Sequence, residues 1–271
     1  MGCLAACLWR TVPLARAQAR AEARAEARAE ARAEALSSGG ADTSGTTFVV
    51  RIENVSNRAT LKLSTSGSVA IPLSAGVWAV HTGDSPIFTP GVPEAGIGLK
   101  GLAEAGITDP FAANLRTLRN VRTADVFDKP KGHRRGMPKG DVDREAASKM
   151  LQPGQHFEFS LRAHRGERLS FAMMLAQSND AVVATPPSGL ELFDALGRPV
   201  SGDVTSRTTL WDAGTEVNED PGVGRNQGLR QGAPHAGDPE RRPVRPLGDA
   251  EFGQLWPAAD RIVRVMIKPG K

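Results

Sequence analysis

Apolar and polar residues alternate along several stretches of the chain, and this two-residue period is typical of a β-strand with one buried face. The clearest examples are residues 47–55 and residues 155–162, where two phenylalanines and a leucine share one face. Residues 168–176 are instead almost continuously apolar, which predicts a central strand covered on both faces. We therefore expect the sheet that contains this last segment to lie inside the fold.

Weaker strand signals fill much of the remaining chain, at residues 59–63, 71–80, 190–196, 203–211 and 261–267. Pro72 and Gly76 interrupt one of these segments, which predicts an irregular edge strand there. Helical signals are short and lie at residues 101–106, 109–118 and 144–151. With 29 glycines and 19 prolines for turns, the pattern predicts an all-β fold, an antiparallel β-sandwich with a few short helices in the connections.

The first part of the chain has a different composition. Residues 1–19 hold both cysteines, Cys3 and Cys7, so no disulfide can stabilise the folded part. Residues 4–7 are similar to a bacterial lipoprotein box, and small-x-small patterns at residues 15–19 are typical of signal-peptidase sites. We interpret this leader as a signal peptide whose start lies upstream of Met1; the alternative is an extension without function.

A low-complexity spacer follows the leader. Residues 20–35 are four copies of Arg-Ala-Glu-Ala, and this period places like charges at i,i+4 and gives no apolar stripe to bury. Residues 36–45 are rich in Ser, Gly and Thr and predict a flexible linker. The folded domain is therefore expected to span residues 46–269.

Composition and charge narrow the functional classes. The net charge of +4 is modest, and the basic segment at residues 128–140 has no aromatic residue among its charges. These features predict no nucleic-acid binding, since single-strand binding needs stacking platforms as well as charge. We interpret that segment as a solvated loop, with contact to a phosphate or polyanion as the alternative. No run of about 20 apolar residues exists, so no transmembrane helix is predicted.

An acidic loop follows the strand predicted at residues 203–211. It carries four carboxylates within ten residues: Asp212, Glu216, Glu219 and Asp220. Crowded carboxylates repel each other unless a cation lies among them, and Ca²⁺ prefers oxygen ligands of this kind. The alternative is a solvated turn in which Asp212 bonds its own backbone. The spacing is not that of an EF-hand.

Two motifs resemble a known family. The segment Ser-Phe-Ala-Met-Met-Leu-Ala-Gln-Ser-Asn-Asp at residues 170–180 and Trp-Asp-Ala-Gly-Thr-Glu at residues 211–216 are similar to the spondin N-terminal domain, also called the F-spondin domain. Residues 77–81 and 98–104 also look like its bacterial stand-alone members. The resemblance implies a C2-like antiparallel β-sandwich with Ca²⁺ at the loops of one end. Animal relatives are secreted matrix proteins.

Carried over to this sequence, the resemblance implies that Asp180, Asp212 and Glu216 bind the Ca²⁺. The sequence departs from the family pattern in two ways: Ala181 and Val182 replace aromatic residues, and Glu216 stands where animal members have an aspartate. We expect Asp180 and Asp212 to emerge at the same end of the sandwich, provided that their strands run in the same direction. The expected protein is then a monomeric, secreted or periplasmic module that binds a protein or glycan ligand at the cell surface, with a lipid anchor if the leader is a truncated lipoprotein signal.

Catalysis has little support in the sequence. The five histidines show no paired metal spacing, and neither a nucleophile elbow nor a phosphate loop is present. His235 is a candidate neighbour of the acidic loop, but an exposed position is the simpler interpretation. We therefore expect a non-enzymatic module. The alternatives are a metal-dependent hydrolase that uses the same carboxylates as acid and base, and a structural domain without metal.

Overall fold

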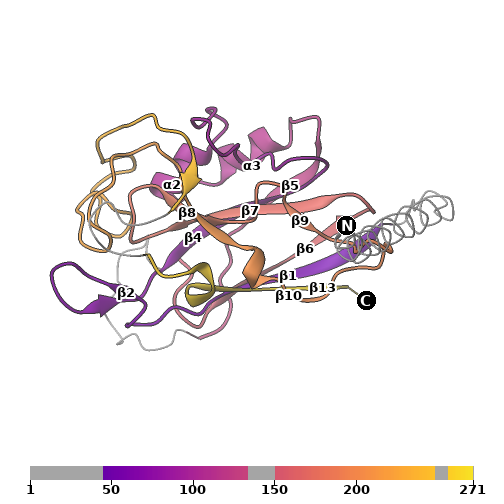
Figure 1. Cartoon of the computed structure of the whole chain (residues 1–271), viewed down its shortest axis with the longest axis horizontal. Coiled ribbons are helices and arrows are strands. Elements are labelled where there is room, and N and C mark those ends of the chain that lie inside the picture. The colour runs from indigo at the N-terminus through magenta and orange to yellow at the C-terminus, as the bar shows by residue number, and fades with distance from the viewer. Residues whose placement is uncertain (1–44, 134–149, 248–255, 271) are drawn as a thin grey trace, which may run out of the picture.

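The computed structural model describes residues 45–133, 150–247 and 256–270. The expected leader and Arg-Ala-Glu-Ala spacer lie outside these residues, as do most of the helix expected at 144–151 and half of the basic loop expected at 128–140. Within the described residues the chain forms thirteen strands and two α-helices, and every strand pairing is antiparallel (Figure 1). This confirms the prediction of an all-β sandwich with short helices in its connections.

The first sheet has four strands among the described residues, in the order β10-β13-β1-β6. Their bounds are β1 (Thr46–Asn54), β6 (His156–Ala163), β10 (Gly202–Asp203) and β13 (Val263–Pro269). Strand β1 alternates as the sequence predicts, with Phe48, Val50 and Ile52 fully buried on one face. The last long strand, β13, therefore pairs with the first, β1, so the two ends of the domain lie side by side in this sheet.

The second sheet is larger, with the order β12-β11-β8-β7-β4-β5 and with β9 beside the first residues of β7. Its strands are β4 (Leu73–His81), β5 (Val121–Phe127), β7 (Arg168–Leu175), β8 (Ala181–Ala184), β9 (Leu190–Glu191), β11 (Thr209–Asp212) and β12 (Arg245–Pro246). Strand β7 lies at the centre and is buried along nearly its whole length. The prediction of a central strand covered on both faces is confirmed.

Two apolar clusters cover the two faces of the second sheet. Trp78, Phe171 and Met173 point between the sheets and pack against side chains of β1, β6 and β13. Val77 and Ala172 point the other way, towards α2 (Leu99–Ala105) and α3 (Asp109–Leu115), which lie over the outer face in Figure 1. Successive side chains of β4 and β7 point to opposite faces of the sheet, so each strand contributes to both apolar clusters.

Several local predictions were wrong. Residues 203–211 are not one strand: β10 belongs to the first sheet, a 3-10 turn at Thr205–Arg207 follows, and β11 belongs to the second sheet. Residues 190–196 form a strand only at β9. The segment at 59–63 forms a strand only at β2 (Leu61–Lys62), which pairs with β3 (Ser68–Val69).

The expected edge strand at residues 71–80 is in fact central, because β4 pairs with both β5 and β7. Gly76 does not mark an edge. A Cβ at this position would lie 2.2 Å from the Phe127 ring and 2.5 Å from the Ala172 carbonyl oxygen. The glycine therefore allows close packing inside the sheet, which is the other common meaning of a glycine within a strand.

Within the described residues, no helix has the length and apolar character needed to cross a membrane.

Candidate functional site

Asp180 and Asp212 meet at one end of the second sheet. Asp180 follows β7 and directly precedes β8, while Asp212 is the last residue of β11. Strand β8 runs antiparallel to both β7 and β11, so those two strands run in the same direction. Asp212 is paired in register with Ala181, and the Ala213 amide donates to the Asp180 carbonyl oxygen at 3.2 Å. The expectation that both acids emerge at the same end is confirmed.

Asp180 is completely buried and only half of its carboxylate is paired. Its Oδ2 accepts hydrogen bonds from the backbone amides of Thr215 at 2.6 Å and Glu216 at 3.1 Å, with the Thr215 hydroxyl at 3.3 Å. Its Oδ1 is buried and has no hydrogen-bond partner. A buried acceptor without a partner costs free energy, so this oxygen needs either a proton or a cation.

Asp212 has a full set of partners. Its Oδ1 accepts from the Gly214 amide at 2.7 Å, which is the Asx-turn named above as the alternative to a metal ligand, although the turn is buried and not solvated. Its Oδ2 accepts from the Asn218 amide at 3.0 Å and from two nitrogens of Arg245 at 2.8 and 3.1 Å. Arg245 is therefore the countercharge of Asp212 in this structure.

The Asp-Ala-Gly-Thr turn has a glycine for a clear geometric reason. Gly214 has a φ of 67°, in the left-handed region that L side chains rarely adopt. A Cβ at this position would lie 2.5 Å from the carbonyl oxygen of Arg242, whose amide donates to the Gly214 carbonyl oxygen at 2.8 Å. The turn is thus packed against the segment that brings Arg245 to Asp212.

The third expected ligand, Glu216, is also buried, and its backbone amide bonds Asp180. Asp180, Asp212 and Glu216 are called the carboxylate cluster below. Glu216 is 1% exposed, and its Oε1 accepts from the Gly237 amide at 3.2 Å. Its Oε2 is buried and makes no hydrogen bond. Asp180 and Glu216 therefore each bring one unpartnered oxygen to the same end of the sheet.

A further buried carboxylate comes from α2. Glu104 is fully buried and bonds the side chains of Lys100, one turn earlier, and His235, in the long loop between β11 and β12. The partner on the histidine is Nδ1, so Nε2 faces away from the glutamate, and the side chain is 38% exposed. His235 has a φ of 59°, the one positive value among the described non-glycine residues, which marks local strain.

The other two acids of the predicted loop have structural roles. Glu219 accepts from the Asn226 backbone at 2.8 Å and from its side-chain amide at 2.9 Å. Asp220 bonds the Ser64 hydroxyl near the β2–β3 hairpin. The long loop after residue 217 is therefore a hydrogen-bonded structure, and it lies beside α2 at one end of the sandwich (Figure 1).

Electrostatics follow from this burial. Loss of solvation, followed by the charge of Asp212, raises the pKa of Asp180 to about 7, although the Thr215 and Glu216 amides oppose the change. Burial, followed by the charge of Glu104, raises the pKa of Glu216, and the Gly237 and Asn179 amides oppose it. The carboxyl groups of Asp180 and Glu216 therefore both hold their protons more tightly than in water.

The arrangement does not provide a complete cage of acidic ligands. Among residues 45–133, 150–247 and 256–270, no three His, Cys, Asp or Glu side chains form a group that could hold a metal ion. Of the three expected ligands, Asp180 and Glu216 have a free oxygen, whereas Asp212 is bonded to Arg245 and Asn218. Amide and carbonyl oxygens and water would have to complete a calcium shell of six to eight oxygens.

Sequence reasoning missed two charged neighbours of this cluster, Glu104 and Arg245. Arg245 lies 33 residues after Asp212, in a segment with little apolar content, and its place depends on a two-residue strand. Glu104 lies on α2, where a local pattern predicts only an i,i+4 pair with Lys100. His235 was named as a candidate neighbour, and the structure brings it next to the cluster through Glu104.

Comparison of the chain with protein-family models and with curated proteins finds no match.

Proposed function

We propose that this protein is an exported, non-enzymatic β-sandwich module that binds Ca²⁺ at the end of its second sheet and mediates surface or matrix-type interactions. The observation that carries the proposal is the pair of buried, unpartnered carboxylate oxygens, Asp180 Oδ1 and Glu216 Oε2. The resemblance of residues 170–180 and 211–216 to the spondin N-terminal domain supports the same ion. Export is supported by the leader at residues 1–19.

The physical argument rests on charge. Removing a proton from Asp180 places a negative charge beside Asp212, in a site where burial already disfavours charge. A divalent cation would compensate that charge and give the unpartnered oxygens a ligand. The residues that would hold it are Asp180 and Glu216, with Asp212 as a third ligand if calcium displaces Arg245. Calcium stabilises structure but is a weak generator of hydroxide, which fits a binding module.

Thermal unfolding with and without calcium tests the proposal. A ligand that binds only the folded state raises stability, by about 2.7 kcal/mol at a hundredfold excess over Kd. For a domain of this size that corresponds to roughly 5–10 °C in Tm. The full chain at pH 8 should therefore melt lower in chelator than in millimolar calcium. Equal melting temperatures would reject the calcium site.

Asp180→Asn is the matched variant, because an amide keeps the acceptor for the Thr215 and Glu216 amides and removes only the charge. It should fold normally and show no response to calcium. Terbium offers a direct readout, since Trp211 precedes Asp212 and absorbs the light that sensitises a nearby lanthanide. Wild-type protein should give sensitised emission that calcium competes away, and Asp180→Asn should give none.

The hydrolase alternative has one specific observation in its favour, the Glu104–His235 pair. A buried carboxylate on Nδ1 orients an imidazole so that Nε2 can act as a general base, and His235 is partly exposed. Ester, phosphodiester and glycoside substrates should nevertheless give background rates with the full chain. Turnover that is lost in His235→Gln and kept in Asp180→Asn would replace the binding module with a hydrolase.

A further inference from the structure

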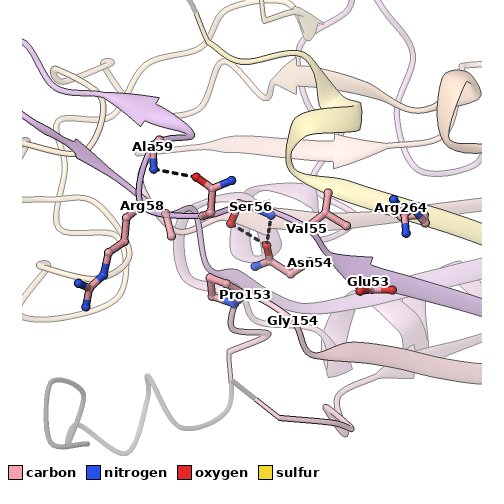
Figure 2. Close-up of a pocket in the computed structure, with 11 residues that line it drawn as sticks. Glu53, Asn54, Val55, Ser56, Arg58, Ala59, Pro153, Gly154 and Arg264 are labelled. Atoms are coloured by element: carbon pink, nitrogen blue, oxygen red, sulfur yellow. Dashed lines mark hydrogen bonds between the residues drawn. The ribbon is translucent and has the colours of Figure 1, made fainter. Parts of the chain in front are cut away.

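A pocket of about 590 Å³ opens where β1 ends, and its lining includes none of Asp180, Asp212 and Glu216 (Figure 2). Its lining comes from the end of β1 and the following loop, from Ala70, from Pro153 and Gly154 before β6, and from Arg264 on β13. This volume is within the usual range for a site that holds a small ligand. Nothing in the proposed calcium site uses these residues.

The pocket has a rigid floor. The Asn54 side-chain amide donates to the carbonyl oxygens of Ile71 at 2.9 Å and Leu151 at 2.8 Å, and its Oδ1 accepts from the amide and hydroxyl of Ser56. Asn54 is fully buried. These bonds join three separate segments under the pocket, so its shape is set by the fold before any ligand binds, and a ligand pays little ordering entropy.

The charge around the pocket is unbalanced. Arg58 and Arg264 lie at opposite ends of it in Figure 2, and neither makes an ion pair within the described residues. Hydrogen bonds from Thr205 lower the pKa of Asp203, and the nearby charge of Arg264 adds to this effect without a direct bond between the two side chains. The one acid in the lining, Glu53, pairs with Arg51 at 3.5 Å and also stands directly opposite Arg264 in the β1–β13 pairing. The lining therefore carries two arginines against one glutamate, and its net charge is positive.

The remaining groups favour a hydrophilic ligand. Asn57 uses its Oδ1 to accept from the Ala59 amide at 2.8 Å, and its side-chain NH₂ makes no hydrogen bond within the described part of the chain. The apolar lining is limited to small aliphatic side chains, and no aromatic residue contributes. An apolar peptide side chain or a lipid tail would bury little surface here. A ligand that carries hydroxyl groups and an anionic group could bond the amide, guanidinium and carboxylate groups of the lining.

We propose that this pocket binds an acidic sugar unit, a saccharide residue carrying a carboxylate or sulfate group. The guanidinium groups of Arg58 and Arg264, at opposite ends of the pocket, would each bond an anionic or hydroxyl group of the ligand, and further sugar hydroxyls would bond Asn57 and Glu53. This assignment rests on the proposed function in one respect, because an acidic sugar is the ligand that the proposed surface-interaction module would bind. It does not require calcium, because Asp180 and Glu216 are absent from the lining.

Calorimetric titration of the full chain in chelator tests the assignment separately from the calcium site. The probes are trigalacturonate, its fully methyl-esterified form, and a sulfated disaccharide. We expect saturable binding of at least one acidic probe and none of the neutral ester. Arg264→Gln and Arg58→Gln should each weaken binding by about tenfold, the value of one charge-assisted hydrogen bond.

Lys268→Gln is the matched control, since Lys268 is an exposed residue on β13, four positions from Arg264 and on the same face. It removes the same charge outside the pocket and should leave affinity unchanged. The proposal is overturned if neither acidic probe binds, if the neutral ester binds equally well, or if Lys268→Gln weakens binding as much as Arg264→Gln. Equal binding of an acidic peptide of the same charge would also overturn it, in favour of a protein partner.

Discussion

Asn54 and Asp180 are both fully buried polar residues, yet their surroundings differ. Both side-chain atoms of Asn54 that can form hydrogen bonds have partners at 2.6–3.0 Å, in three different segments. Asp180 has donors on one oxygen only, and its other oxygen has none. Asn54 is neutral, whereas Asp180 carries a charge once it loses its proton.

The difference separates a residue that stabilises the fold from one that, under the proposed function, binds a cation. A buried side-chain amide with all its hydrogen bonds made stabilises the fold, because shortening the side chain leaves several buried polar groups without partners. An unsatisfied buried carboxylate works against the fold once it is ionised. Conservative substitutions in the two regions should therefore have opposite effects on stability.

The largest expected effect is the pH dependence at Asp180. Its pKa of about 7 in the folded protein lies above the ordinary value of 3.8. Between these values the native state holds a proton that the unfolded chain has lost. The stability from this group is therefore fully present below about pH 4 and is lost as pH rises through about 7. Each pH unit in that window costs about 1.4 kcal/mol, on the order of 4 kcal/mol in all.

Asp180→Asn should remove this loss. In chelator, urea unfolding from pH 4 to pH 8 should show the variant becoming progressively more stable than the wild type, with the difference level above pH 7. Comparison with the wild type at each pH cancels the titration of other groups. A constant difference across the whole range would show that Asp180 stays ionised in the folded protein.

The opposite sign is expected at Asn54. Asn54→Ala removes two donors to backbone carbonyls and the acceptor of Ser56, and it leaves a small cavity, so the free energy of unfolding should fall by about 3 kcal/mol. Chemical denaturation at pH 7 measures it. Asn57→Ala is the control, because the exposed Asn57 bonds only the Ala59 amide through its side chain and should lose less than about 1 kcal/mol. A loss at Asn54 as small as that at Asn57 would remove the contrast between the two buried residues.

Arg245→Gln tests how the carboxylate cluster balances its charge. Asp212 is 1% exposed, and it would keep only Asn218 and the Gly214 amide as partners. In chelator the variant should lose about 2 kcal/mol, less than a fully buried pair, since the arginine is partly exposed. Calcium should restore much of that loss and should bind the variant more tightly than the wild type. If calcium affinity instead falls, the arginine does not compete with the ion.

The smallest effect is expected inside the sheet, at His81. It is fully buried, with Nε2 at 2.8 Å from the Ser170 hydroxyl and Nδ1 unpartnered. Burial lowers its pKa below 6.5, so the unfolded chain takes up a proton first as the pH falls. Stability from His81 is therefore present above about pH 6.5 and is lost below it, by up to about 1.4 kcal/mol per pH unit.

His81→Gln should lose some stability at pH 7 and should show a weaker decline than the wild type between pH 6.5 and pH 5. Denaturant unfolding at several pH values measures both. Parallel curves for the two proteins would show that His81 does not titrate in this range.

The sequence by itself determined the fold class and the position of the central strand. Two-residue periodicity and the apolar run at residues 168–176 are local properties of the chain, and they predicted β1, β6 and β7. The crowding of Asp212 and Glu216 after one strand, with Asp180 after another, also predicted that these carboxylates come together at one end of the fold. Strands of two to four residues, such as β8 and β12, were missed because they have no period long enough to recognise.

Only the tertiary structure decided how the charges are balanced. Whether Asp180 is paired or unpaired depends on which loop amides reach each oxygen, and Arg245 comes to Asp212 through a register between two short strands. Glu104 comes near the carboxylate cluster because α2 packs over β7 and β8. The burial and the ion pairing of a side chain depend on neighbours that are distant in sequence, so a local pattern of residues cannot predict them.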